Sequence, residues 1–185
     1  MKRVAMALAV VVLASGCETF DRQGPRADAV LLTAKDHPLW GSVSFVEVDG
    51  GGLVRADVRG LPFGGVFGFH VHEKGDCSSA DFTSAGGHFN PGGKPHAHYA
   101  GPERHAGDLP NLEADGEGNA TYAFETKLLT VAKGPNSVVG RAVVIHARPD
   151  DYKSQPAGNA GPRIACGLIR AMDEGSGPLF PRLSR

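Results

Sequence analysis

The sequence predicts an all-β domain, an antiparallel sandwich or barrel that carries two long functional loops. Short runs rich in Val, Ile, Phe and Thr alternate with turns rich in Gly, Asn and Asp, a pattern typical of β-sheets. Beyond the N-terminal segment, no stretch has the periodicity of a convincing helix. Two long separators, residues 73–117 and 148–163, are rich in Gly, Pro, Asn and Asp. Loops of this length inside a compact domain are usually functional.

The chain contains six segments with strand character. The first two, residues 41–49 and 53–58, read as a hairpin joined at the glycine turn 50–52. The other four are apolar runs bounded by turn residues, at positions 66–72, 120–128, 138–147 and 164–171. Each is short enough for a strand and is separated from the next by turn residues, which favours an antiparallel arrangement.

The composition fits one globular domain and argues against two classes of partner. A chain of 185 residues with 41% apolar content is long enough to bury one sizeable core. Its formal net charge of −1 gives no reason to expect nucleic acid or an anionic lipid surface as a partner.

The N-terminal segment has the features of an export signal. Lys2 and Arg3 precede an apolar run at residues 4–14, which is about half the length that a bilayer span needs. The run ends at Cys17, and the residues before it resemble a bacterial lipoprotein box, in which the cysteine becomes the lipidated first residue. We therefore expect an exported, periplasmic protein anchored to a bacterial membrane through Cys17. The alternative is ordinary signal cleavage after Gly16.

These features divide the chain into four parts. We expect a signal peptide at residues 1–16, a lipidated cysteine and polar tether at 17–28, the folded domain at 29–172 and a loose tail at 173–185.

Two cysteines remain when Cys17 is set aside. In an oxidising compartment, Cys77 and Cys166 would normally form a disulfide. Such a bridge would close a loop of about 90 residues, for which the chain-entropy treatment gives roughly 4 to 5 kcal/mol as an upper figure. The alternative is a pair of buried free thiols.

Two strand-like segments each place histidine where it could bind a metal. His70 and His72 are two residues apart on a predicted strand, so both imidazoles project from the same face. An isolated pair of this kind is weak evidence for a metal. His146 ends a strongly apolar strand, where an unpartnered imidazole would be costly. Taken alone, a hydrogen-bonded core histidine would explain it.

A third cluster strengthens the case for metal. His88, His96, His105 and Asp108 lie in a Gly/Pro-rich loop that has little reason to bury histidines for packing. Three imidazoles and one carboxylate can form a closed tetrahedral zinc site. If His88 also joins the first group, its two ring nitrogens can hold two metals at once. The second metal would then have an all-nitrogen set, suited to copper, and that set is His70, His72, His88 and His146.

The motifs around these residues are similar to those of copper/zinc superoxide dismutases. They are GFHVHE at 68–73, GGHFNP at 86–91, RHAGDL at 104–109, GRAVVIH at 140–146 and GNAGPRIACG at 158–167. The similarity runs from about residue 29 to 172, with the motifs in the family's order. It implies a Greek-key β-sandwich or flattened barrel of about eight antiparallel strands.

The resemblance also implies the site. It assigns one copper per subunit to His70, His72, His88 and His146, and one zinc per subunit to His88, His96, His105 and Asp108, with His88 as the bridge. It implies that Asp150 hydrogen-bonds His70 and His96, one ligand of each metal, as outer carboxylates do in metal sites. Cys77 and Cys166 match the family's intrasubunit disulfide. Asp151 is read as a solvated loop acid.

Two histidines are left without a metal in this assignment. His96 and His98 could each be the zinc ligand, but the intervals from His88 and to His105 fit the family at His96. His98 is read as a spare, and His37 as an unliganded surface residue.

The activity implied is the disproportionation of superoxide to dioxygen and hydrogen peroxide by a ping-pong cycle, with copper changing valence and His88 passing a proton. Arg163 matches the family's arginine at the channel mouth, where a permanently charged guanidinium can attract the superoxide anion. The resemblance also implies that a homodimer can form, because related enzymes pair, although through different faces.

Two other classes of protein fit the residues less well. A copper carrier of the same fold would most simply lack a copper ligand or the channel arginine. An adhesion module would have no need of seven metal-ligating side chains.

Overall fold

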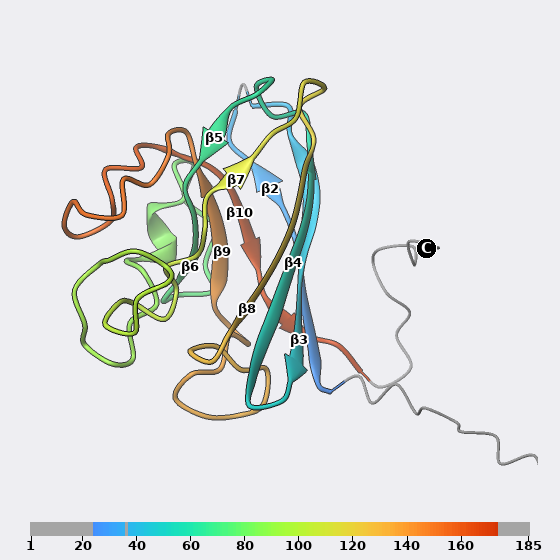
Figure 1. Cartoon of the computed structure of the whole chain (residues 1–185). Helices are drawn as coiled ribbons and strands as arrows, with labels where there is room; N and C mark the ends of the chain where they lie inside the picture. Colours follow the sequence, from blue (N-terminus) through green and yellow to red (C-terminus); the bar gives the residue numbers. More distant parts are fainter. Residues whose placement is uncertain (1–23, 36, 174–185) are drawn as a thin grey trace, which may run out of the picture.

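The computed structural model describes residues 24–35 and 37–173. The predicted signal peptide, Cys17 and all but one residue of the predicted C-terminal tail lie outside these ranges. The described part is built from two antiparallel sheets packed face to face (Figure 1). Its only helical segment is one 3₁₀ turn, η1 (Thr83–Ala85), so nothing in the described ranges forms a helix with the length and apolar character of a bilayer span. The predicted all-β class is confirmed.

The larger sheet has five strands in the order β11-β1-β3-β4-β8. These are β11 (Arg170–Ala171), β1 (Arg26–Val30), β3 (Trp40–Val48), β4 (Gly51–Arg59) and β8 (Ala120–Thr126). The smaller sheet has the order β2-β10-β9-β6. Its strands are β2 (Leu32–Thr33), β10 (Arg163–Leu168), β9 (Ala142–His146) and β6 (Phe69–His72), and β5 (Val66–Phe67) pairs separately with β7 (Leu112–Glu113).

Two parts of the chain pass from one sheet to the other. β1 lies in the larger sheet and β2 in the smaller, and β10 and β11 make the same change in reverse. Because β1 pairs with β11 and β2 pairs with β10, these segments join the sheets along one side. The sandwich is therefore closed there like a flattened barrel.

Several predicted strand limits were wrong, each for a local reason. The predicted strand 66–72 is divided at Gly68, whose N–H donates to the carbonyl of Arg148 instead of to a ladder. The predicted strand 138–147 begins only at Ala142, because the preceding residues form a turn in which Arg141 N–H donates to Val138 O. The glycine turn at 50–52 is shorter than predicted, since Gly51 and Gly52 already pair with β3.

The N-terminal limit of the domain also differs. Strand pairing begins at Arg26, within the predicted tether 17–28, because Arg26 pairs with Val46 of β3 and its guanidinium forms an ion pair with Asp28 at 2.7 Å. β1, β2 and β7 have no counterpart among the predicted strands. β1 follows a polar stretch, and β2 and β7 are only two residues long.

The alternation of side chains along the smaller sheet determines where polar groups can gather. Phe69 and Val71 of β6 face the core between the sheets, as do Val143 and Ile145 of β9. The alternate residues of both strands therefore face the outer side of the sheet. Two loops, residues 73–111 and 147–162, lie on this side and cover it (Figure 1).

Candidate metal centre

The candidate site lies on the outer face of the smaller sheet, beneath the two loops. His70 and His72 project from β6 to that face, and they pair across the ladder with Val144 and Ala142 of β9. His146 ends β9 on the same face. Because an antiparallel sheet often buries only one face in its core, the other is free to carry a polar site.

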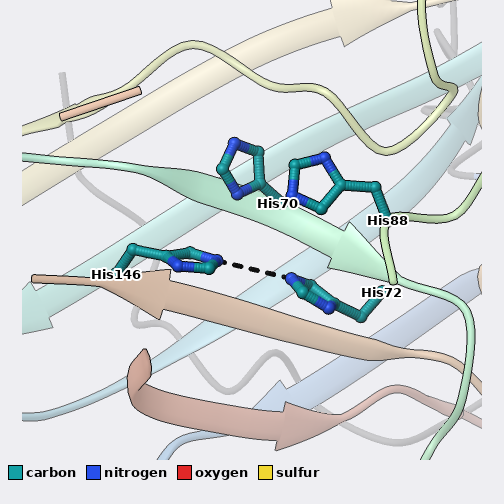
Figure 2. Close-up of side chains that lie close together, drawn as sticks. All are labelled: His70, His72, His88 and His146. Atoms are coloured by element: carbon teal, nitrogen blue, oxygen red, sulfur yellow. Dashed lines mark hydrogen bonds between the residues drawn. The ribbon is translucent and has the colours of Figure 1, made fainter. Parts of the chain in front are cut away.

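Four imidazoles, these three and that of His88, converge at one point. His70, His72, His88 and His146 are all buried, and each offers a ring nitrogen within 4.8 Å of the others. The Nε2 atoms of His72 and His146 are 3.4 Å apart (Figure 2). The Nδ1 atom of His70 and the Nε2 atom of His88 are buried without any hydrogen-bond partner. Buried nitrogens without a partner are costly, so the group fits a bound cation.

The second group shares His88 with the first. It contains His88, His96, His105 and Asp108, again with ligand atoms within 4.8 Å of one another. Asp108 Oδ1 lies 2.8 Å from His88 Nδ1, 3.0 Å from His96 Nδ1 and 3.2 Å from His105 Nδ1. A tetrahedral zinc ion with ligands at roughly 2.0 to 2.1 Å would set its ligand atoms about 3.3 Å apart. The spacing therefore fits a small tetrahedral cation.

His88 presents a different nitrogen to each group. Its Nδ1 lies beside Asp108, whereas its Nε2 has no hydrogen-bond partner and is free for the first group. The ring centroids of His88 and His70 are 4.0 Å apart. One imidazole that faces two ligand sets with its two nitrogens is arranged to join two metals. No other residue belongs to both groups in the part of the chain that the structure describes.

The outward-facing nitrogens of His72 and His146 are held by backbone carbonyls. The N–H of His72 Nδ1 donates to the carbonyl of Gly86 at 2.9 Å, and that of His146 Nδ1 donates to Gly161 at 3.0 Å. Such bonds select the tautomer that leaves the opposite nitrogen, Nε2, free to bind a metal. The residues present therefore fit copper and zinc on the chemistry of the donor set.

Asp150 orients one ring of each group. Its Oδ2 accepts from His70 Nε2 at 2.8 Å, and its Oδ1 lies 3.0 Å from His96 Nε2. Asn111 holds the loop here, because its Oδ1 accepts from Asp150 N–H and its Nδ2 donates to Asp150 O. Gly158 has φ +65°, and a Cβ there would collide with the Asp150 carboxylate.

The protonation of the histidines follows from burial. Desolvation holds the pKa of His70 and of His72 well below the ordinary value. It also lowers the pKa of His146 to about 4. These rings are neutral at pH 7, as metal ligands must be. Burial would lower the pKa of His96 as well, but the carboxylates of Asp108 and Asp150 raise it to about 9.

Arg163 reaches the site through an irregularity in β10. The ladder between β10 and β9 shifts register between Arg163 and Ala165. Ile164 and Ala165 therefore both contribute to the core, and Arg163 lies opposite His146 on the outer face. A bulge of this kind re-aims a side chain.

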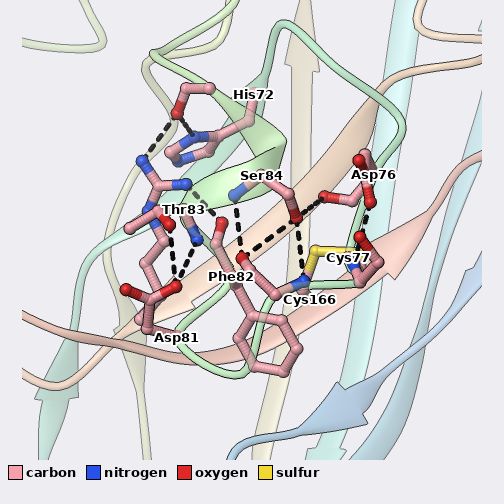
Figure 3. The surroundings of a disulfide bond; sticks show 12 residues. His72, Asp76, Cys77, Asp81, Phe82, Thr83, Ser84 and Cys166 are labelled. Atoms are coloured by element: carbon pink, nitrogen blue, oxygen red, sulfur yellow. Dashed lines mark hydrogen bonds between the residues drawn. A yellow bond between two sulfur atoms is a disulfide. The ribbon is translucent and has the colours of Figure 1, made fainter.

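The guanidinium is then fixed by the loop that it meets. Its Nη1 donates to the carbonyl of Phe82 at 2.5 Å, and its Nη2 donates to that of Gly86 at 2.6 Å. The loop is tied to β10 by a disulfide between Cys77 and Cys166, with Cα atoms 5.8 Å apart (Figure 3). The predicted disulfide is confirmed, and the alternative of two free thiols was wrong.

A pocket of about 420 Å³ opens beside the first group. His146 forms part of its wall, and the loop between β9 and β10 supplies the rest, including Ser154, Gln155 and Asn159. His146 is the one member of the first group in this lining.

The remaining histidines lie apart from the two groups. His98 is exposed, stacks on Tyr99 with ring centroids 4.2 Å apart, and accepts from Ala100 N–H. His37 is exposed in the segment between β2 and β3. The exposed Asp151 carboxylate accepts from the backbone of Lys153 and Ser154.

Two residues that shape the site were not predicted in that role from the sequence. Gln155 binds the backbone of His96 at both its N–H and its carbonyl, at 2.9 and 2.7 Å. The buried guanidinium of Arg104 donates to the carbonyls of Tyr99 and His105. Amide and arginine contacts to backbone across a loop have no sequence pattern of their own.

Comparison with known proteins agrees with this geometry. The family described as "Copper/zinc superoxide dismutase (SODC)" matches residues 39–169. "Superoxide dismutase [Cu-Zn] 2" of Aquifex aeolicus is 42% identical over 152 residues, which cover 80% of this chain and 88% of that protein. "Superoxide dismutase [Cu-Zn]" of Schizosaccharomyces pombe is 41% identical over 149 residues, which cover 76% and 96%.

Two solved structures are similar in fold. The clock protein EA4 has a TM-score of 0.73 and 40% identity, over 81% of this chain and 96% of that one. A double mutant of a SOD-like protein from Bacillus subtilis has a TM-score of 0.71 and 37% identity, over 77% and 96%.

Proposed function

The chain belongs to the copper/zinc superoxide dismutase family and disproportionates superoxide to dioxygen and hydrogen peroxide, and we propose how its own residues divide that work. Copper and zinc are its cofactors. We assign copper to His70, His72, His88 and His146, and zinc to His88, His96, His105 and Asp108. The four-nitrogen set suits a redox-active ion, and the set with a carboxylate suits zinc.

This proposal rests on the two ring nitrogens of His88, which belong to different ligand groups. The ring has Nδ1 at 2.8 Å from Asp108 Oδ1, while its Nε2 is buried and without a partner. When bound, copper supplies electron transfer in both directions, and zinc supplies a fixed positive charge. His88 Nε2 is then the atom placed to take up a proton in one half of the cycle and to release it to the peroxide formed in the other, with water supplying the second proton.

Asp150 keeps the rings of His70 and His96 in a fixed orientation during this cycle. Its two oxygens accept from one ring of each group, so neither imidazole can rotate without losing a buried hydrogen bond. Arg163 attracts the superoxide anion, because its guanidinium lies on the same face as His146 and carries a permanent positive charge.

The assignment is tested by metal analysis and superoxide decay on the purified protein, before and after chelation. We expect about one copper and one zinc per chain, with activity lost on chelation and restored by both metals. His96→Ala should lose zinc, whereas the matched variant His98→Ala should retain it. Bound copper without turnover would instead indicate a copper carrier.

We also propose that the protein is exported and held at a membrane by lipid on Cys17. The Cys77–Cys166 disulfide supports an oxidising compartment, where such bridges persist. Residues 1–16 would act as the signal peptide, and residues 17–25 would tether the domain. Mass spectrometry of the mature N-terminus should find a lipidated Cys17, and Cys17→Ser should move the protein to the soluble fraction. A free N-terminus at Cys17 would indicate ordinary cleavage.

We further propose that two chains pair as a homodimer. Three large apolar side chains, one each on β1, β2 and β3, support this, because they are well exposed: Val30 at 63%, Leu32 at 57% and Trp40 at 66%. Sedimentation of the wild type and of Leu32→Lys at several concentrations tests it, and a wild type that stays monomeric throughout would refute it.

A further inference from the structure

Arg163 is held at the site without an ionic partner of its own. Its guanidinium donates to the carbonyls of Phe82 and Gly86. Within the described ranges it forms no ion pair at 4.0 Å or less. Its charge is therefore not neutralised by direct contact, and what an approaching anion experiences depends on the charges around it.

Asp81 is placed beside this arrangement by the backbone. It directly precedes Phe82, which adopts a left-handed conformation with φ 59° and ψ 18° that a phenylalanine rarely takes. The Phe82 ring is buried in a small cluster with Ala85, Val144 and Cys166. The buried ring and the bond from Arg163 together hold this conformation, and they hold Asp81 near the guanidinium.

The Asp81 carboxylate is itself fixed in one position. Its Oδ1 accepts from the backbone N–H of Thr83 at 3.1 Å and from the Thr83 hydroxyl at 2.7 Å. Among the described residues, Asp81 is the charged side chain with the largest effect on the pKa of Arg163, which burial lowers and Asp81 raises. The Thr83 bonds fix the carboxylate, and its position one residue before Phe82, whose carbonyl accepts from Arg163 Nη1, places this negative charge within electrostatic reach of the guanidinium.

We propose that Asp81 sets how strongly the site attracts superoxide, because its negative charge offsets part of the field of Arg163 at the mouth of the site. The inference rests on the proposed role of Arg163 as the residue that attracts the substrate. Asp81 touches neither metal group and acts only by weakening the field of Arg163. It is therefore a positioning residue whose effect applies to any small anion that approaches the site. Its removal should therefore increase substrate capture.

The chain offers a matched control in Asp76. Asp76 is also exposed, and it also accepts from a backbone N–H two residues later, that of Ser78 at 2.9 Å. It lies next to Cys77, and Figure 3 shows it on the opposite side of Ser84 from Asp81. Asp81→Asn and Asp76→Asn change net charge equally, and each asparagine keeps an oxygen for the same N–H.

The test compares the two variants in superoxide decay and in azide binding to the metal-loaded protein. At about 10 mM ionic strength, we expect Asp81→Asn to raise the second-order rate constant about two- to three-fold, the size of a unit charge acting through water over about 7 to 10 Å, well inside the Debye length of about 30 Å. Its dissociation constant for azide should fall by a similar factor. Asp76→Asn should change either quantity by less than about 1.5-fold, and near 1 M salt both effects should vanish.

Equal effects from the two variants would overturn the proposal, because they would reflect net charge alone. An unchanged azide affinity in Asp81→Asn would overturn it too. Arg163→Gln separates this inference from the function on which it rests. An unchanged rate there refutes the role of Arg163, whereas a reduced rate with an unaltered Asp81→Asn refutes only the role of Asp81.

Discussion

Replacing Asp150 by asparagine tests whether one carboxylate orients a ligand of each metal. The two oxygens differ in their other contacts, because Oδ1 also accepts from Tyr152 N–H at 2.6 Å, whereas Oδ2 accepts from His70. An asparagine should therefore keep its carbonyl oxygen at the Oδ1 position, where it serves Tyr152 and His96. Its NH₂ group then faces His70 Nε2–H, donor against donor.

The expected loss follows from that geometry. A buried hydrogen bond to a charged group contributes about 1.5 to 3 kcal/mol. Loss of a hydrogen-bond partner that orients a metal ligand typically lowers metal affinity by about 10- to 100-fold. We expect copper affinity to fall within that range in Asp150→Asn, and zinc affinity to fall less. Competition with a chromophoric chelator, one metal at a time, measures both.

Asp151→Asn is the matched control. Asp151 is the next residue, and the Oδ1 that accepts from Lys153 and Ser154 is retained in asparagine. Its copper and zinc affinities should equal those of the wild type. Equal losses of copper and zinc in Asp150→Asn would contradict the assignment of the two oxygens, and no loss at all would contradict the orienting role.

Three further predictions follow from the same contacts. Arg163→Gln should lower the rate constant at low salt and flatten its dependence on ionic strength, and an unaltered salt profile in stopped-flow decay would count against steering. Cys77→Ser should lower the free energy of unfolding by up to about 4 to 5 kcal/mol, as expected for a cross-link 89 residues apart. Denaturant titration measures this, and a midpoint equal to that of the wild type would be inconsistent with it. In the metal-free protein, the pKa of His146 is about 4 when folded and about 6.5 when unfolded, so the unfolded state binds the proton first. Stability should then fall as the pH drops from 6.5 toward 4, by about 2 kcal/mol at pH 5 from this group, and His146→Gln should reduce that slope.

Much of the site could be predicted because its signals are local. The pair His70 and His72 depends only on the two-residue period of a strand, and that period does place both rings on the outer face. The intervals around His88 and Asp108 are also properties of the chain itself. The choice of His96 over His98 followed from the match of these intervals to the family that the motifs resemble, and His98 is exposed and outside both groups.

Other features depend on contacts between distant segments. The sequence around Arg163 does not reveal the shift of register that turns it toward His146, because a bulge is defined by the partner strand. Nor does it reveal the carbonyls of Phe82 and Gly86, which accept from Arg163 across 81 and 77 residues. The early start of β1 at Arg26 likewise depends on its pairing with β3.

The sequence by itself determined the class of fold, the ligand types and their order, because side-chain chemistry and strand periodicity are properties of short segments. Only the tertiary structure decided which ring nitrogen faces which group, how Asp150 divides its two oxygens, and which charge lies beside Arg163. The physical reason is that hydrogen bonds and electrostatic fields depend on distances in space, and only the packing of the two loops on the sheet sets those distances.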